Sequence, residues 1–204
     1  ECEPYLTSEY RIMLENPEEI LIGTRIMMTA LGVKKAYVGI EDNKPKAIKV
    51  MKELCSKSYR DIKIVSLQKK YPQGGEKQLI DAILGRQVPS MGLPIDTGVV
   101  VQNVGTALAV YEAVQKNKPL FEGVVTVTGK CMTEQRNFRM RVGTTFESML
   151  FAVGGFPKDA EKLVSGGPMM GKAVARIEAA SVKSTSALLL LTEEETKRKP
   201  EGNW

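Results

Sequence analysis

Residues 62–85, IKIVSLQKKYPQGGEKQLIDAILG, contain the pattern that decides the fold class. Residues 62–67 are short, apolar and rich in β-branched side chains, which predicts a strand. A proline and two glycines at 71–75 predict a loop, and a helix is expected over about 77–84, where Gly85 ends it. A strand, a loop and a helix in this order predict one βα unit of a parallel sheet.

The same order of elements precedes this stretch. Asn16 and Pro17 predict a capping residue and the first turn of a helix, and Gly32 predicts its end. A short buried strand is expected at 36–40, and Pro45 opens a second helix.

The pattern also continues downstream. A loop rich in proline and glycine at 88–98 leads to an apolar run at 99–102, which predicts a strand, and a helix is expected over about 104–115. Strands that alternate with helices of this length predict a parallel sheet covered on both faces. We therefore expect a three-layer α/β domain at residues 1–118.

The pattern changes after Pro119. Two strands and a short helix are predicted at residues 124–128, 137–142 and 146–153. They indicate a small α+β domain at 119–172. A last buried strand at 187–191 could return to either domain, and we expect residues 173–204 to contain this return strand and a charged linker.

Composition excludes several classes of function. The 204 residues include no histidine and only three cysteines at unrelated positions, so neither an ordinary Cys/His metal site nor a His-based triad is expected. The net charge of +5 is spread along the chain, which disfavours nucleic-acid binding. No apolar run reaches the roughly 18 residues of a spanning helix, so we expect membrane association only through a partner. The chemistry is expected from carboxylates or a bound organic cofactor.

The acidic segment at the beginning of the chain is the first candidate site. Glu1 and Glu3 flank Cys2, and two carboxylates one residue apart in an extended segment point the same way. Such a pair could accept hydrogen bonds from sugar hydroxyls or from a flavin N–H. The alternative is an exposed chain terminus, which the chemistry alone favours.

The loop that contains Tyr71, Gly74, Gly75 and Glu76 is the second candidate. It follows the carboxyl end of a strand, where ligands bind in α/β sheets. The glycines allow close approach of the backbone to a ligand, Tyr71 could lie against an aromatic ring, and Glu76 could hold a ribose. The alternative is a simple turn whose Glu76 complements the helix dipole.

The third candidate is the start of the helix expected at 104–115. Gln102, Asn103, Val104 and Thr106 lie where the strand passes directly into that helix, and free backbone N–H groups there form a natural phosphate site. The alternative is that Asn103 and Thr106 only cap the helix.

Six motifs together resemble one known family, the C subunit of the Rnf electron-transport complex. They occur in the family's order, at residues 1–7, 39–45, 71–80, 102–107, 126–129 and 165–171. That family is in turn similar to the flavin-bearing NADH subunit of respiratory complex I. The resemblance implies a Rossmann-like FMN and NADH domain, followed by a small β-grasp domain of the soluble-ligand-binding (SLBB) type.

The implied activity is hydride transfer from NADH to FMN, followed by single-electron transfer to iron–sulfur clusters. By resemblance, Glu1 and Cys2 would line the flavin and Glu3 would face the nicotinamide nucleotide. Tyr71 and Glu76 would lie between the two cofactors, and glycines 74 and 75 would allow the flavin's approach. The residues of the third candidate (Gln102, Asn103, Val104 and Thr106) would hold the ribityl phosphate end. No acid–base catalyst is implied.

The resemblance also implies partners. The chain would be a peripheral subunit on the cytoplasmic side of the membrane, in a complex that exchanges electrons between ferredoxin and NAD. The family's glycine-rich flavin loop would precede Glu1, and a segment holding [4Fe-4S] clusters would follow the tail. Two alternatives remain: a flavoprotein similar to cobalamin reductase, and a docking module without catalytic activity.

Overall fold

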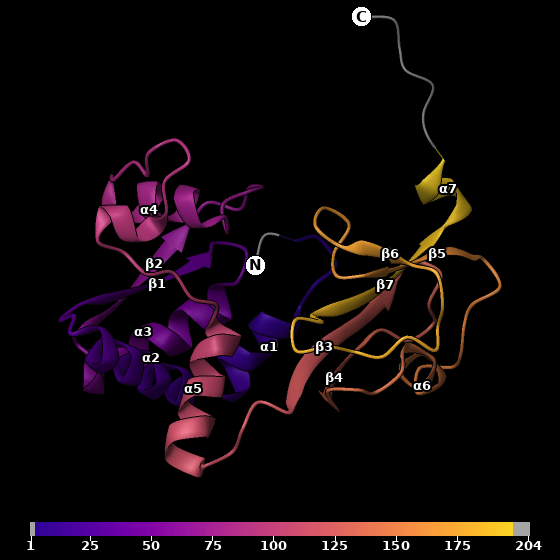
Figure 1. Ribbon diagram of the computed structural model, residues 1–204, viewed down its shortest axis with the longest axis horizontal. Helices are drawn as coiled ribbons and strands as arrows, with labels where there is room; N and C mark the ends of the chain where they lie inside the picture. Colours follow the sequence, from indigo (N-terminus) through magenta and orange to yellow (C-terminus); the bar gives the residue numbers. More distant parts are fainter. Residues whose placement is uncertain (1–2, 198–204) are drawn as a thin grey trace, which may run out of the picture. The chain divides into compact units, whose positions relative to one another are not determined.

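The computed structural model describes residues 3–197, which divide into two compact units (Figure 1). Unit 1 contains residues 9–120, and unit 2 contains Glu3–Ser8 together with the residues from Phe121 onward. Each unit has its own sheet. Among the described residues, no helix combines the length and the apolar character that crossing a bilayer requires.

Unit 1 consists of helices around a two-stranded parallel sheet. Its helices are α1 (Ser8–Glu15), α2 (Pro17–Leu31), α3 (Pro45–Ser58), α4 (Glu76–Leu84) and α5 (Val104–Lys116), with a short 3-10 helix η1 (Pro94–Thr97). Its strands are β1 (Ala36–Glu41) and β2 (Ile62–Leu67). They pair in parallel register, from Ala36 opposite Ile62 to Glu41 opposite Leu67. In Figure 1 this pair lies between α4 and the helices α2 and α3, so the predicted layers are confirmed.

Local signals fix the ends of these helices. α2 begins at Pro17 and ends before Gly32, whose φ of 67° is the left-handed conformation that glycine adopts at low cost. α4 ends in the same way at Gly85, with φ 64°. Asn16 precedes α2, but its side chain makes no capping hydrogen bond, so the sequence predicted the boundary correctly and the cap wrongly.

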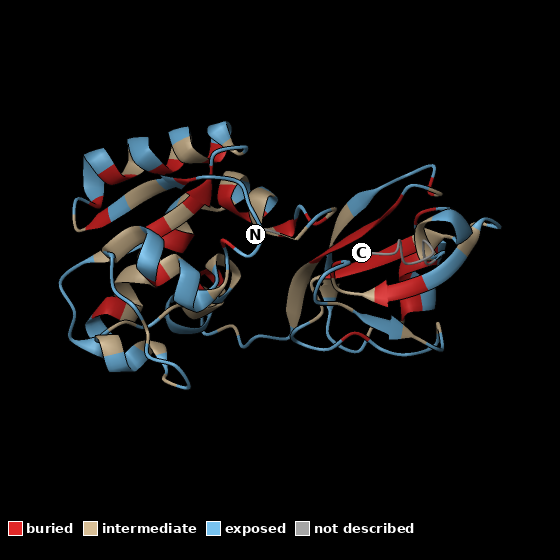
Figure 2. Cartoon of the chain, turned by 90° about the horizontal axis from the view of Figure 1, so that it is seen from above, coloured by how far each residue is buried: buried red, intermediate tan, exposed pale blue. Residues whose placement is uncertain are grey.

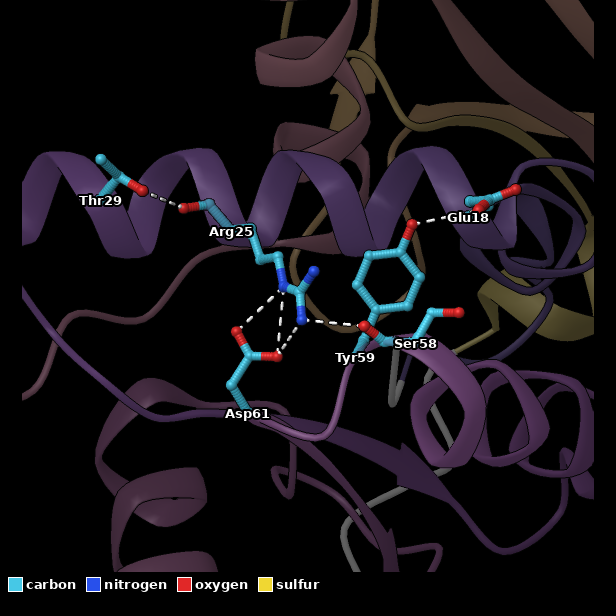
Figure 3. A network of polar contacts seen from close by, with 6 residues as sticks. All are labelled: Glu18, Arg25, Thr29, Ser58, Tyr59 and Asp61. Carbon is cyan, nitrogen blue, oxygen red and sulfur yellow. Dashed lines mark hydrogen bonds and ion pairs between the residues drawn. The ribbon is translucent and has the colours of Figure 1, made fainter.

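One polar network ties α2 to the end of α3 and the start of β2 (Figure 3). Arg25 of α2 donates to Asp61 from Nε to Oδ2 at 3.0 Å and from Nη2 to Oδ1 at 2.5 Å. The same Nη2 donates to the carbonyl oxygen of Ser58 at 2.9 Å. The guanidinium lies 4.5 Å from the centroid of the Tyr59 ring, and the Tyr59 hydroxyl donates to Glu18 at 3.1 Å. The helix is therefore held to the sheet by side chains from α2 and from the α3–β2 turn.

The strand predicted at 99–102 does not form. Among the described residues, unit 1 has only β1 and β2 as strands, and residues 98–104 line a cavity of about 580 Å³. The backbone N–H groups of Ala36 and Asp42 donate toward the β2 side, so those of the alternate residues Tyr37 and Gly39 face the opposite edge. That edge lines the same cavity. An apolar run becomes a strand only where a neighbouring strand pairs with it, and no described segment does so here.

Unit 2 is a mixed five-stranded sheet in the order β4-β3-β7-β5-β6. Its elements are β3 (Glu122–Gly129), β4 (Arg136–Arg141), α6 (Phe146–Phe151), β5 (Ala160–Ser165), β6 (Lys172–Val174), β7 (Ala187–Thr192) and α7 (Glu193–Thr196). β3 and β7 are parallel and the other pairs are antiparallel.

The strand whose place the sequence left open lies at the centre of unit 2. β7 pairs with both β3 and β5, so the unit extends past residue 172, where the sequence placed the end of the small domain. Four successive residues, Ala187 to Leu190, are fully buried, which means that both faces of this strand are covered. Figure 2 shows the buried residues of unit 2 in red on its strands. Residues 193–196 form the short helix α7, where a linker was expected.

Candidate nucleotide-binding site

Hydrogen bonds connect the two loops that leave the carboxyl edge of the β1–β2 sheet. The backbone N–H of Asp42 donates to the carbonyl of Leu67 at 2.7 Å, just beyond the last paired residues of the two strands. The Asp42 side chain then accepts a hydrogen bond from the N–H of Lys69 at 3.1 Å. The two loops that leave this edge are thereby tied together. In α/β folds this is the edge at which ligands bind.

The second candidate, the loop at 71–75, lies between β2 and α4. It folds as a turn in which the N–H of Gly75 donates to the carbonyl of Pro72 at 2.8 Å. A Cβ on Gly75 would lie 2.5 Å from Oε1 of Gln78, at the movable end of that side chain, and 3.1 Å from the carbonyl oxygen of Pro72, so a larger residue there would crowd the turn. Tyr71 is 44% exposed, and Gly74 and Glu76 are exposed as well. These three residues are accessible to a ligand.

The third candidate lies at the start of α5. Oδ1 of Asn103 accepts the N–H of Gly105 at 2.7 Å, so Asn103 caps the helix, as the alternative interpretation predicted. First-turn N–H groups have no acceptor within a helix, and Asn103 takes only one of them. Those of Val104 and Thr106 therefore remain directed at the space before the helix. Gln102 and Thr106 are exposed and Val104 is half-buried.

The cavity of unit 1 brings part of the predicted site together. Gln102, Asn103 and Val104 line it, and so do Leu79 and Ile80 of α4. Helices α4 and α5 therefore border one cavity. The residues from Tyr71 to Glu76 do not line it.

Two buried polar side chains at this edge escaped the sequence prediction. Glu41, the last residue of β1, is only 7% exposed, and its Oε2 accepts from Nζ of Lys44 at 2.7 Å. Its Oε1 is buried without a hydrogen-bond partner among the described residues. Gln73, in the loop before α4, is 6% exposed. The signal available in the sequence was an acid directly after the strand expected at 36–40, to which the sequence analysis assigned no binding role.

Glu3 of the first candidate lies in unit 2. Its Oε2 accepts the backbone N–H of Met169 at 3.1 Å, and its Oε1 is buried without a partner among the described residues. A Cβ on Gly167 would overlap this carboxylate, with 2.6 Å to Cδ, so the glycine-rich turn leaves room for Glu3. In the sequence, this turn at 165–171 served only as one of the six family motifs. Glu1 and Cys2 lie outside the described residues.

The described residues include no group of three or more Cys, Asp or Glu side chains placed to hold a metal ion. The ionisable groups at the sheet edge are instead carboxylates beside amides and helix starts. Such a set accepts and donates hydrogen bonds to hydroxyls, amides and phosphates. It is suited to an organic nucleotide.

An α/β unit with polar groups at the carboxyl edge of its parallel strands and a second unit with a small mixed sheet define a two-domain protein of the α/β class, in which ligands bind at that edge. The chain belongs to the family described as the Nuo51 FMN-binding domain, which matches residues 1–112. Residues 124–173 match the SLBB domain. The predicted fold class, an α/β domain followed by an SLBB-type domain, is confirmed.

Relatives with curated names confirm the resemblance to the Rnf C subunit. The chain is 48% identical over 192 residues to the C subunit of the proton-translocating ferredoxin:NAD(+) oxidoreductase complex of Clostridium ljungdahlii, covering 94% of this chain and 42% of the relative. It is 42% identical over 197 residues to the Na(+)-translocating counterpart of Acetobacterium woodii, covering 97% and 44%. The chain thus spans less than half the length of these relatives.

A solved structure shows the same fold. The chain is similar to an NAD+-reducing [NiFe]-hydrogenase in the H2-reduced state, with a TM-score of 0.71 and 18% sequence identity. The similarity covers 94% of this chain and 39% of that one. At this identity the likeness concerns the fold alone.

Proposed function

We propose that this chain is the FMN-binding and NADH-oxidising part of the C subunit of an ion-translocating ferredoxin:NAD(+) oxidoreductase. The family match over residues 1–112 and the names of the curated relatives support this proposal. The observation that carries it is the start of α5, where a capped helix presents unused N–H groups beside exposed amide and hydroxyl side chains. These groups adjoin a cavity of about 580 Å³.

The residues present fit FMN chemically. The start of α5 offers backbone N–H groups and the positive end of the helix dipole to a phosphate, through Val104 and Thr106. Gln102 adds an amide donor for a phosphate or ribityl oxygen. Tyr71 offers an exposed ring face to a flavin or nicotinamide ring, and Gly74 adds no side chain that would obstruct it.

The bound flavin would supply hydride acceptance from NADH and release of electrons one at a time. The residues of the chain would supply position. Glu76, exposed at the start of α4, would accept a hydrogen bond from a nucleotide hydroxyl, and Tyr71 would hold the ring plane. Hydride transfer needs close, aligned donor and acceptor atoms and no proton-transfer residue, so alignment is the contribution of these side chains. By family resemblance, Glu1, Cys2 and Glu3 are also proposed as nucleotide-binding residues.

The whole protein is proposed to work as a peripheral subunit on the cytoplasmic side of a membrane complex. Its partners would be the other subunits of that complex. The [4Fe-4S] clusters that receive the electrons would belong to a segment outside these 204 residues. Unit 2 would be the structural link between the flavin domain and such a segment.

The deciding experiment is the visible spectrum of the full-length protein before and after anaerobic addition of NADH. A flavin band that NADH bleaches, with a simultaneous change in iron–sulfur absorbance, is expected. A flavin that NADH leaves oxidised would exclude NADH as the donor, and reduction of cob(III)alamin would then identify a cobalamin reductase-like protein. A protein without flavin after reconstitution with FMN would be a docking module.

A further inference from the structure

The carboxylate of Glu41 is almost completely buried, although its ion pair occupies only one of its two oxygens. Its side chain is 7% exposed, and the Lys44 side chain that pairs with it is 12% exposed. That pair occupies Oε2 alone, at 2.7 Å, while Oε1 is buried without a partner among residues 3–197. A buried carboxylate oxygen that has lost water and gained no donor is unfavourable, so the site is complete only when a donor is present.

Strand geometry gives the direction of this side chain. Side chains alternate along a strand, so Glu41 and Gly39 lie on the same face of β1. A Cβ on Gly39 would meet Leu79 and Ile83 of α4, at 3.0 and 3.3 Å, so that face is the one α4 covers. α4 follows β2 and begins at the carboxyl edge, and Glu41 is the last residue of β1 at that same edge. Glu41 therefore lies on the face and at the edge where α4 starts.

A second polar group marks the same place. Gln73 lies in the loop that leads from β2 into α4, and its side chain is buried, with 6% exposed. The start of α4 has no side-chain cap, since Gly75 is its N-cap residue. A buried acid thus ends β1, and a buried amide and an uncapped helix start follow β2 from the same edge of the sheet. Three groups of this kind suit a polar ligand with both donors and acceptors.

The chemistry of Glu41 restricts the ligand group. An ionised carboxylate only accepts hydrogen bonds, and its charge repels a phosphate. The partner must be an O–H or N–H donor. A sugar carries adjacent hydroxyls, and a carboxylate at the carboxyl end of a strand is a general means of holding them.

We infer that Glu41 is a ligand-binding residue whose Oε1 accepts a hydrogen bond from a sugar hydroxyl of the bound nucleotide. This inference rests on the proposed function, because it assigns the residue to the nucleotide that the site would bind. The hydroxyl belongs either to the ribityl chain of FMN or to a ribose of NADH. Gln73 and the start of α4 form the rest of this subsite.

The test uses the full-length protein with Glu41→Gln, which keeps the side-chain shape and removes the charge. The matched control is Glu112→Gln, which changes an ion pair with Lys118, of 3.0 Å, at the end of α5. Each protein is titrated with FMN and with lumiflavin, which has the ring and lacks the ribityl chain. The FMN-loaded proteins are titrated with NADH and with 1-methyl-1,4-dihydronicotinamide, which lacks the ribose. Thermal unfolding without ligand reports the fold.

The expected result for Glu41→Gln is an approximately tenfold higher Kd for one nucleotide, FMN or NADH, with the Kd of its sugar-free analogue unchanged. The nucleotide affected identifies the sugar. Glu112→Gln should change neither Kd. Unchanged affinity for both nucleotides in a folded variant overturns the inference, and so does an equal loss for a nucleotide and its analogue. If the wild-type protein binds no flavin, the proposed function itself fails and this inference fails with it.

Discussion

The hydroxyl of Tyr5 donates a hydrogen bond to Oε1 of Glu195 over 2.9 Å, although 190 positions separate the two residues. The same Oε1 forms an ion pair with Nζ of Lys130 at 3.1 Å. Oε2 accepts a hydrogen bond from the backbone N–H of Thr192 at 3.1 Å. Thr7 adds a further contact with unit 2, since its N–H donates to the hydroxyl of Thr126 at 3.2 Å. Residues 3–8 are therefore anchored in unit 2, in part through the residues that cap α7 near the end of the described chain.

Removing the Tyr5 hydroxyl should destabilise unit 2. Tyr5→Phe is expected to lower the free energy of unfolding by about 1–2 kcal/mol, because it deletes a hydrogen bond to a charged acceptor. Urea denaturation followed by circular dichroism measures this change. Tyr37→Phe, at a 38% exposed tyrosine of unit 1, is the control and should change the stability little. Equal losses in the two variants would show that the contact with Glu195 contributes nothing.

Acid should weaken the same anchor. Burial raises the pKa of Glu195, but hydrogen bonds from the Thr192 N–H, the Tyr5 hydroxyl and Lys130 outweigh it, and the pKa falls from 4.5 to about 2. The folded state then binds this proton less readily than the unfolded state. The stabilisation is complete above pH 4.5 and is lost as the pH falls toward 2. Unfolding free energies measured across this window should fall less steeply for Glu195→Gln than for the wild type, and parallel slopes would contradict the assignment.

The parts of the fold that sequence predicts are the ones that local signals determine. The limits of α2 and α4 follow from Pro17 and from glycines with positive φ at 32 and 85. The apolar runs at 99–102 and 187–191 look equally strand-like, yet only the second forms a strand, because pairing depends on segments distant in sequence. The burial of Glu41 was hidden for the same reason, because α4, which covers the face of β1 at Gly39, comes later in the chain.

The contact between α2 and α5 depends on Gly23, which no sequence signal singled out. Helix propensity alone predicts that Gly23→Ala gains about 1 kcal/mol. A Cβ at this position, however, would overlap the carbonyl oxygen of Ala107 and lie 2.7 Å from its carbonyl carbon. Since both partners are backbone, the helices must separate, and we expect a loss of about 2–3 kcal/mol in chemical denaturation. Gly123→Ala is the control, because nothing lies within 4 Å of its Cβ. A gain in stability for Gly23→Ala would refute this packing.

The Arg25–Asp61 pair should contribute a small, measurable coupling. Hydrogen bonds from Arg25 lower the pKa of Asp61. The side chains are 43% and 32% exposed, so water screens the pair, and we expect a coupling energy of about 1 kcal/mol. A double-mutant cycle of Arg25→Lys and Asp61→Asn measures it, because lysine keeps the charge and loses the two-pronged geometry (Figure 3). If the losses of stability in the two single variants add up to the loss in the double variant, the paired hydrogen bonds of Arg25 contribute no coupling energy.

A single change at the start of α5 can separate phosphate binding from helix capping. Asparagine and aspartate cap helices about equally well, so Asn103→Asp should preserve the hydrogen bond from the Gly105 N–H. The change removes one exposed amide contact, of 3.4 Å, with Glu9, so we expect the stability of the helix to change little. It also places a negative charge where the FMN phosphate is proposed to lie. We expect the Kd for FMN to rise at least tenfold, while the Kd for riboflavin, which has no phosphate, stays the same. Flavin fluorescence titration of the full-length protein measures both constants. If the two flavins lose affinity equally, Asn103 acts on the ring or the fold, and if neither does, the phosphate is held elsewhere.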